Sequence, residues 1–134
     1  MNFALIMAGG TGSRMNSSIP KQFLSLNGVP ILIHTLRVFE QCPSIDAICL
    51  ACSSSHLSMI KKLIAEYHLK KVRFFANAGA DRRLSSKNAV DAIAPYCSSE
   101  DIVLIHDAVR PFLTQRIVEE NIEAAKKYGA VYTV

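Results

Sequence analysis

The sequence predicts an α/β fold, a Rossmann-like and mostly parallel sheet with helices on both faces. Short apolar segments alternate along the chain with segments whose apolar residues recur at helical spacing, which is typical of such a sheet. At 134 residues with 50% hydrophobic content, the chain has enough apolar side chains for the core of one domain. It contains no internal repeat, linker or low-complexity segment.

The first strand is expected at about residues 3–7, and a long loop, residues 8–28, follows it. A loop of that length inside a compact domain is usually functional. Pro30 then opens a helix that extends to about Gln41, because proline fits the first turn of a helix. The apolar side chains of this helix share one face: Leu32, Leu36 and Phe39.

The alternation continues with three more strands, at residues 47–51, 71–76 and 101–105, and a fifth strand begins at 130–134. Side chains that can cap a helix start precede the helices between them: Ser54 or Ser55, Asp81, and Thr114. The helix at 82–94 stops before Pro95, and the last helix ends at Gly129. Two of these helices have a clear apolar face: Leu57, Ile60, Ile64 and Tyr67 in one, and Val118, Ile122 and Ala125 in the last.

The charge pattern excludes several classes of protein. The net charge is +4, but many of the lysines fall on helix faces. No basic strand with aromatic residues and no recognition helix accompanies them, so nucleic-acid binding is not indicated.

No apolar run is long enough to span a bilayer. No basic segment precedes the first apolar run, so no signal peptide is expected, and the predicted compartment is the cytoplasm.

The four cysteines are interpreted as buried, reduced thiols. Cys49 and Cys52 have the spacing of zinc ligands, but no second closely spaced Cys/His pair follows them. They also lie inside an apolar run that reads as a strand, which favours a role in the core.

Three loops, residues 8–21, 77–85 and 106–111, each follow a predicted strand and carry Gly, Arg and Asp. Because parallel strands end at the same edge of a sheet, we expect these loops to meet where α/β sheets bind ligands. Small residues in the first loop let backbone N–H groups approach a ligand, and Arg14 and Lys21 add positive charge, which suits a polyphosphate. The loop lacks the third glycine of a dinucleotide fingerprint and the Gly-Lys-Ser/Thr of a P-loop.

The segment Ala8-Gly9-Gly10-Thr11-Gly12-Ser13-Arg14-Met15, with Pro20-Lys21-Gln22-Phe23, resembles the signature of nucleotide-sugar pyrophosphorylases. More narrowly, it is similar to cytidylyltransferases of the IspD and TarI types, which make CDP-methylerythritol and CDP-ribitol. Gly79-Ala80-Asp81-Arg82-Arg83-Leu84-Ser85 and His106-Asp107-Ala108-Val109-Arg110-Pro111 resemble the next two motifs of that family. The resemblance covers essentially the whole chain, and it implies the fold of nucleotide-diphospho-sugar transferases.

The resemblance implies that a sugar-alcohol phosphate attacks the α-phosphorus of CTP and that pyrophosphate leaves. Backbone amides of Ala8, Gly9, Gly10, Thr11 and Gly12 would hold the triphosphate. Arg14 and Lys21 match the catalytic pair of the family and would neutralise charge in the transition state. The alternative for Lys21 is an ordinary solvated lysine.

Further roles follow from the other two motifs. Gly79 and Ser85 match positions that hold the cytosine, and Ala108 falls among the nucleotide-binding positions. Ala78 departs from the pattern, since many methylerythritol-type members have a second glycine there. Arg82 either holds its loop in place or reaches a phosphate.

Asp107 and Arg110 match the positions that meet the metal and the incoming substrate. Asp107 is a Mg²⁺ ligand on this reading, and Mg²⁺ is the expected cofactor; its alternative is a capping aspartate. Arg110 would contact the acceptor phosphate. His106 is expected to be structural.

The resemblance also bears on which sugar-alcohol phosphate is the acceptor and on how much of the domain this chain contains. Residues 80–82, 106–114, 119–122 and 128–131 resemble the ribitol-phosphate branch more than the methylerythritol branch, so D-ribitol 5-phosphate is favoured over 2-C-methyl-D-erythritol 4-phosphate. Residues 1–134 are expected to form the CTP-binding portion, truncated at the fifth strand, without the acceptor-binding part and the arm that builds a homodimer. The alternative is a remnant that folds and binds CTP without turnover.

Overall fold

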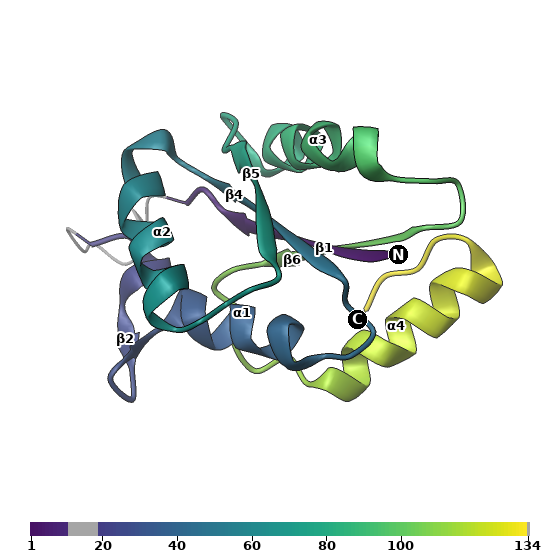
Figure 1. Ribbon diagram of the computed structural model, residues 1–134, viewed down its shortest axis with the longest axis horizontal. Helices are drawn as coiled ribbons and strands as arrows, with labels where there is room; N and C mark the ends of the chain where they lie inside the picture. Colours follow the sequence, from purple (N-terminus) through teal and green to yellow (C-terminus); the bar gives the residue numbers. More distant parts are fainter. Residues whose placement is uncertain (11–18, 134) are drawn as a thin grey trace.

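The computed structural model describes residues 1–10 and 19–133, and in them a four-stranded parallel sheet lies between two layers of helices (Figure 1). The strand order is β5-β4-β1-β6, with the first strand of the chain in an inner position. The strands are β1 (Asn2–Ala8), β4 (Ala47–Cys52), β5 (Val72–Asn77) and β6 (Ile102–Asp107). The α/β fold predicted from the alternation of strands and helices is confirmed.

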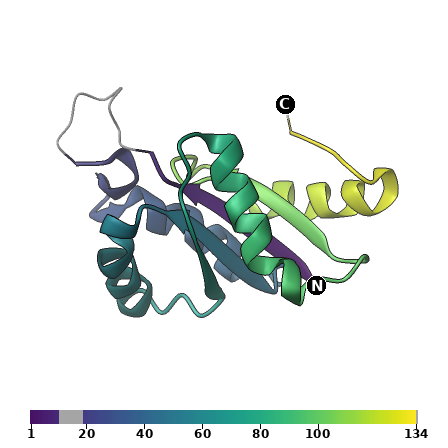
Figure 2. The same ribbon diagram turned by 90° about the horizontal axis from the view of Figure 1, so that it is seen from above.

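Helices α1 (Ile31–Gln41), α2 (Leu57–Glu66) and α4 (Gln115–Tyr128) cover one face of the sheet, and α3 (Arg82–Ile93) lies on the other. Figure 2 shows α3 lying across the strands. Alternate residues of β1 point to opposite layers: Ala4, Ile6 and Ala8 join the core under α1, while Phe3, Leu5 and Met7 join the core under α3. This alternation follows from the two-residue period of a strand.

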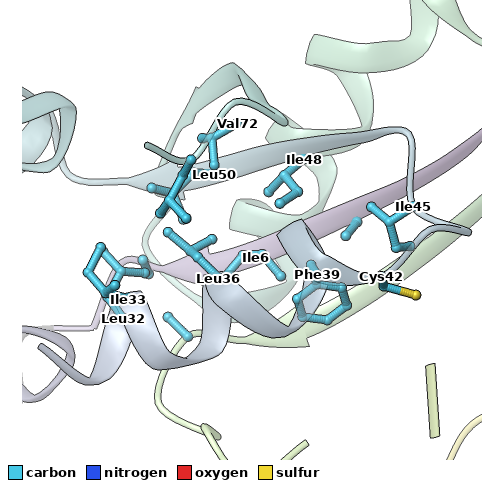
Figure 3. Close-up of a cluster of buried hydrophobic side chains, with 14 of the residues drawn as sticks. Ile6, Leu32, Ile33, Leu36, Phe39, Cys42, Ile45, Ile48, Leu50 and Val72 are labelled. Carbon is cyan, nitrogen blue, oxygen red and sulfur yellow. The ribbon is translucent and has the colours of Figure 1, made fainter. Parts of the chain in front are cut away.

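The larger core forms because α1 places its apolar face against β1 and β4 (Figure 3). Leu36 and Phe39 of α1 are 0% and 1% exposed, and the strand residues beneath them, Ile6 and Ile48, are fully buried. Burial of this kind contributes roughly 1.5–3 kcal/mol for each large apolar side chain. The sheet therefore presents its strand ends from a tightly packed base.

The predicted helix caps are confirmed at three places. The Asp81 carboxylate accepts from the backbone N–H of Leu84 at 2.8 Å, and the Thr114 hydroxyl accepts from that of Ile117 at 3.3 Å. Gly129 ends α4 with φ +86°, a left-handed conformation that glycine adopts without strain. The cap predicted at Ser54 or Ser55 is wrong: Ser53 accepts from Ser55 N at the start of a 3₁₀ turn, Ser54–His56, that leads into α2.

Two other expectations need correction. Residues 130–133 form no strand, because within the described residues this segment has no ladder partner beside β6. The long loop after β1 contains some regular structure: a 3₁₀ turn, Lys21–Phe23, and a two-strand hairpin, β2 (Ser25–Leu26) with β3 (Val29–Pro30). Among the described residues, no helix has both the length and the apolar character needed to cross a bilayer.

Candidate functional site

The three predicted loops do meet at one edge, and backbone hydrogen bonds anchor two of them to strand ends. Ala78 N donates to the carbonyl of Cys52 at 3.0 Å, and Ala108 N donates to that of Met7 at 2.9 Å. The loop after β5 is thereby fixed to the end of β4, and the loop after β6 to the end of β1. The loop after β1, residues 8–21, is called the glycine loop; its described start, residues 8–10, lies between the other two loops, because β1 lies between β4 and β6.

A buried glutamine holds the described part of the glycine loop. Gln22 is 2% exposed, and its Nε2 donates to the carbonyls of Ala8 and Gly10, both at 3.0 Å. These two bonds tie the carbonyls at the start of the loop to the 3₁₀ turn that carries Gln22. Gln22 was missed as a site residue. The only signal in the sequence is its place in Pro-Lys-Gln-Phe, which does not indicate that the side chain turns inward.

Lys21 is exposed and begins the same 3₁₀ turn, so the buried neighbour Gln22 ties its backbone to the glycine loop. An exposed ammonium on an anchored turn can reach an anion bound by that loop. The other predicted members of this region, Thr11, Gly12 and Arg14, lie outside the described residues.

Gly9 is required by the close approach of two loops. A Cβ on Gly9 would overlap the Cβ of Ala78 on the loop after β5. Gly79 is confined in the same way, because a Cβ there would lie 2.5 Å from the Cβ of Leu84 at the start of α3. Gly9 therefore lets the glycine loop approach the side chain of Ala78, and Gly79 lets its own loop fold against the start of α3.

Ser85 is buried, and its hydroxyl is engaged within its own loop. It donates to the carbonyl of Asp81 at 3.0 Å and accepts from the N–H of Gly79 at 2.9 Å. The oxygen lies 3.8 Å from the position of a Cβ on Gly9. Ser85 thus fixes Gly79 against the glycine loop.

Asp107, at the end of β6, is held by two arginines. Its Oδ1 accepts from Arg82 Nε at 2.9 Å, and its Oδ2 accepts from Arg110 Nε at 3.2 Å. Burial by itself raises the pKa of the Asp107 carboxyl, but the hydrogen bonds and positive charges of the two arginines outweigh it and hold that pKa below its ordinary value. Arg82 therefore links the start of α3 to the end of β6.

Asp107 fits the Mg²⁺ ligand that the resemblance implies. Its side chain is 27% exposed, it lies beside the glycine loop, and a hard carboxylate with phosphate oxygens is the usual environment of protein-bound Mg²⁺. Each carboxylate oxygen accepts one hydrogen bond from a guanidinium and keeps a second lone pair, so Asp107 has acceptor capacity left for a cation.

Ala108 and His106 have packing roles on either side of Asp107. Ala108 is fully buried, and its carbonyl accepts from the hydroxyl of Thr35 on α1 at 2.6 Å. The His106 ring packs on Phe39 with centroids 5.5 Å apart, and its Nε2 lies 3.0 Å from the carbonyl oxygen of Arg110. The expectation of a structural His106 is consistent with these contacts.

The cysteine pair does not form a metal site. Cys49 and Cys52 are three residues apart on β4, so their side chains point to opposite faces of the sheet, one under α3 and the other under α1. Both thiols are free, and burial raises the pKa of Cys49 to about 12. Within the described residues, no group of three or more His, Cys, Asp or Glu side chains is placed to hold a metal ion.

A pocket of about 600 Å³ opens beside the glycine loop, between the ends of β4 and β5. Gly9, Pro20, residues 53–56 and residues 77–79 line it. His56 packs edge-on against Phe23, with ring centroids 5.1 Å apart, and its Nδ1 is buried without a hydrogen-bond partner in the described part of the chain. Residues 53–56 give no functional signal in the sequence, because Ser-Ser-Ser-His after a strand is an ordinary helix-start sequence.

Comparisons with known proteins agree with the resemblance seen in the motifs. The model of the IspD family, 2-C-methyl-D-erythritol 4-phosphate cytidylyltransferase, matches residues 2–134. A ribitol-5-phosphate cytidylyltransferase of Streptococcus pneumoniae is 45% identical over 139 residues, and one of Vibrio parahaemolyticus is 41% identical over 134 residues. These matches cover 100% and 99% of this chain but 59% and 56% of the relatives, so the chain spans a little over half of their length.

Solved structures show the same fold. A 4-diphosphocytidyl-2C-methyl-D-erythritol synthase from Anaerococcus prevotii superposes with a TM-score of 0.76 at 26% identity, covering 95% of this chain and 51% of that one. Another synthase of that name gives a TM-score of 0.75 at 27% identity, covering 92% and 53%. With the family model matching almost every residue and the three motifs meeting at one edge of the sheet, the chain belongs to the IspD family of cytidylyltransferases.

Proposed function

We propose that this chain provides the CTP-binding part of a cytoplasmic cytidylyltransferase that transfers CMP to a sugar-alcohol phosphate. The observation that carries the proposal is the arrangement at the sheet edge. The glycine loop is held by Gln22, with exposed Lys21 on one side of it and the Arg82–Asp107–Arg110 group at the end of the neighbouring strand. Backbone amides, cations and one hard carboxylate at the same edge of a sheet suit a nucleoside triphosphate.

In the proposed reaction, an oxygen of the acceptor phosphate forms a bond to the α-phosphorus of CTP. The bond from that phosphorus to the β-phosphate oxygen breaks, and pyrophosphate leaves. The attacking phosphate is already largely anionic at neutral pH, so no general base is needed. The protein must instead bring anions together, and Arg14, Lys21 and the amides of residues 8–12 would neutralise the developing charge.

Asp107 would hold Mg²⁺, which when bound supplies positive charge to the triphosphate oxygens. Arg110 is exposed just after β6 and would meet the acceptor phosphate through the guanidinium N–H groups that Asp107 does not engage. Arg82, at the start of α3, would contact the nucleotide phosphates. The loss of one such contact typically lowers turnover by roughly 10²- to 10³-fold.

D-ribitol 5-phosphate is the proposed acceptor, with 2-C-methyl-D-erythritol 4-phosphate next. The two relatives at 41–45% identity are named ribitol-5-phosphate cytidylyltransferases, whereas the methylerythritol synthases of known structure are 26–27% identical. A homodimer is also proposed. Val103 and Ile105 on β6 are 41% and 44% exposed and offer apolar surface to a second copy, which light scattering would detect as a doubled mass.

The test is pyrophosphate release from CTP and Mg²⁺ with each acceptor in turn. Release with ribitol 5-phosphate, and its loss in Lys21→Met, would support the proposal, while Lys61→Met on α2 is a matched control. The alternative is a chain that folds and binds CTP without turnover. Binding of CTP without pyrophosphate release would establish that alternative.

A further inference from the structure

We infer that Thr35 of α1 is a positioning residue for the proposed reaction. Its buried hydroxyl holds the β6 turn, residues 107–110, which carries Asp107 and Arg110. This inference rests on the proposed function, because it concerns the two residues proposed to meet the metal ion and the acceptor phosphate. It goes beyond that function by giving a helix outside the three motifs a part in the site.

Three polar side chains are buried among the residues that the structure describes, and each of them binds a different loop of the site. Gln22 binds the carbonyls of the glycine loop, and Ser85 binds the loop after β5. Thr35 binds the carbonyl of Ala108, in the loop after β6. Because burial of a polar group costs free energy unless that group is hydrogen-bonded, three such groups at one edge of the sheet indicate a shared task, the holding of the loops.

The hydroxyl of Thr35 makes its hydrogen bond outside its own helix. Thr35 lies in the middle of α1, where threonine is a weaker helix former than leucine or alanine and usually returns its hydroxyl to a carbonyl of the preceding turn. Here the hydroxyl donates to the carbonyl of Ala108 at 2.6 Å, although the two residues are 73 positions apart. The side chain is 0% exposed, so this bond is shielded from solvent. The helix thus has a residue that serves the β6 turn.

The backbone of Ala108 is held through both of its polar groups. Its N–H donates to the carbonyl of Met7 at 2.9 Å, which ties the turn to β1, and its carbonyl accepts from Thr35, which ties the turn to α1. The N–H of Arg110 donates to the carbonyl of Asp107 at 3.2 Å and closes the turn around Ala108. The backbone that carries Asp107 and Arg110 is therefore fixed relative to the start of the glycine loop.

A second residue of α1 supports the strand end just before the turn. Phe39 follows Thr35 by four residues, so both lie on the same side of the helix. The ring of Phe39 packs on His106 with centroids 5.5 Å apart, and His106 Nε2 lies 3.0 Å from the carbonyl oxygen of Arg110. Because the Phe39 contact does not involve the Thr35 hydroxyl, the hydrogen bond can be tested separately from the packing of the helix.

Loss of the Thr35 hydroxyl would leave the buried carbonyl of Ala108 without its donor. The peptide group would have to turn toward another donor, because a buried acceptor left unpaired is costly, and Arg110 would move with it. We therefore expect the carboxylate of Asp107 and the guanidinium of Arg110 to lose their fixed geometry. The glycine loop should keep its own, because Gln22 holds it independently.

The experiment measures CTP binding by titration calorimetry, once with Mg²⁺ and once with EDTA, so that the ratio of the two affinities isolates the contribution of the metal ion. Thr35→Val replaces the hydroxyl with a methyl group of nearly the same size. We expect it to lower this ratio by about 3- to 10-fold, the factor that one hydrogen bond is worth, and to leave the affinity in EDTA within about twofold. Thr35→Ser keeps the hydroxyl and should restore most of the ratio.

Two control variants accompany Thr35→Val. Ile33→Val removes one methyl group at another buried position of α1, so it should lower the melting temperature slightly and leave the ratio unchanged. Asp107→Asn removes the proposed metal ligand and should abolish most of the ratio.

Hydrogen exchange of the chain without ligands provides a second measurement. Peptides that cover residues 106–111 should exchange faster in Thr35→Val than in the parent chain or in Ile33→Val, because the turn opens locally. Peptides that cover β1 should exchange as they do in the parent chain.

Three outcomes would overturn the inference while the proposed function stands. A ratio that falls in Asp107→Asn but not in Thr35→Val, or unchanged exchange at residues 106–111, would show that the hydroxyl does not hold the turn. Equal losses of affinity with Mg²⁺ and with EDTA would mean that Thr35 supports the fold as a whole. A ratio in Thr35→Ser as low as in Thr35→Val would assign the effect to packing.

The proposed function fails in a different way. If the parent chain binds no CTP, binds it equally with Mg²⁺ and with EDTA, or keeps its ratio in Asp107→Asn, the assignment of CTP or of the metal ligand is wrong, and the inference falls with it.

Discussion

Strands β1 and β6 are parallel neighbours in the sheet, yet only β1 is closed off from solvent. Phe3, Leu5 and Ile6 of β1 are all 0% exposed, whereas Val103 and Ile105 of β6 are 41% and 44% exposed. Both of these β6 residues point to the face on which α3 packs. That helix packs mainly on β5, β4 and β1, and it reaches β6 through the ion pair between Arg82 and Asp107 at the end of the strand.

Because of this difference in burial, the β1 part and the β6 part of the site are held in place by different interactions. The glycine loop follows β1, whose side chains are buried on both faces of the sheet. Gln22 binds the carbonyls at the start of that loop. Asp107 lies at the end of β6, which is partly exposed on one face, and ion pairs to Arg82 and Arg110 hold its side chain in place. Apolar packing of β1 thus positions the glycine loop, whereas ion pairs with two arginines position the carboxylate of Asp107.

The largest expected effect is on stability, and it compares Leu5→Ala with Ile105→Ala. Leu5 is fully buried in the core under α3, so its truncation should lower the free energy of unfolding by about 2–5 kcal/mol. Ile105 is half exposed, and its truncation should cost less than about 1 kcal/mol. Urea unfolding measures both. Equal losses would show that β6 is as well covered as β1, for instance by a second copy.

The packing of the glycine loop gives the next largest effect. Gly9→Ala should destabilise the chain by about 1–3 kcal/mol, because the new methyl overlaps the Cβ of Ala78. Ala78→Gly removes that Cβ, so the double variant should recover most of the loss. Thermal unfolding of the four proteins completes the cycle. Additive losses in the double variant would contradict a direct contact between the two positions.

The elements that local chemistry defines were predictable from the sequence. Asp81 and Thr114 were recognised as caps, and Gly129 as a helix end, because each depends on neighbours within three or four residues. The strand at 130–134 was wrong for the complementary reason. A strand requires a partner, and the apolar, β-branched sequence there has none among the described residues.

The site was predictable only as a set of loops at one edge, which the parallel order of strands dictates. Contacts between different loops at this edge of the sheet produce no periodic pattern in the sequence. Gln22 and His56 look like ordinary loop polar residues, and the pairing of Arg82 with Asp107 joins positions 25 residues apart. The roles assigned to the site residues from the resemblance stay predictions, and Thr11, Gly12 and Arg14 also lie outside the described residues.

Gln22→Glu tests how firmly the β1 side is held. Glutamate is nearly isosteric, but its carboxylate only accepts hydrogen bonds, so it would face the carbonyls of Ala8 and Gly10 without a donor. We expect a loss of roughly 1–3 kcal/mol in stability and weaker CTP binding. Gln41→Glu, exposed at the end of α1, is the matched control. Unchanged unfolding and CTP titrations would mean that the loop does not depend on this clamp.

The smallest expected effect is the pH response of the β6 side, since β1 contains no titratable side chain. The arginines hold the pKa of Asp107 below its ordinary value of 3.8 in the folded chain, against the opposing effect of burial. Its contribution to stability is therefore fully present above about pH 4 and is lost as the pH falls through the lower, folded pKa.

Asp107→Asn removes this contribution, so the melting temperatures of parent and variant should differ modestly at pH 7 and converge as the pH falls below 3.8. Asp101, whose pKa is lowered chiefly by its hydrogen bond to the N-terminal amine, is present in both proteins and cancels in the comparison. Asp91→Asn is the control, because its partner Lys87 and Asp91 itself are 67% and 60% exposed. A constant offset between parent and Asp107→Asn at every pH would mean that the substitution acts through packing, and β6 would then resemble β1 after all.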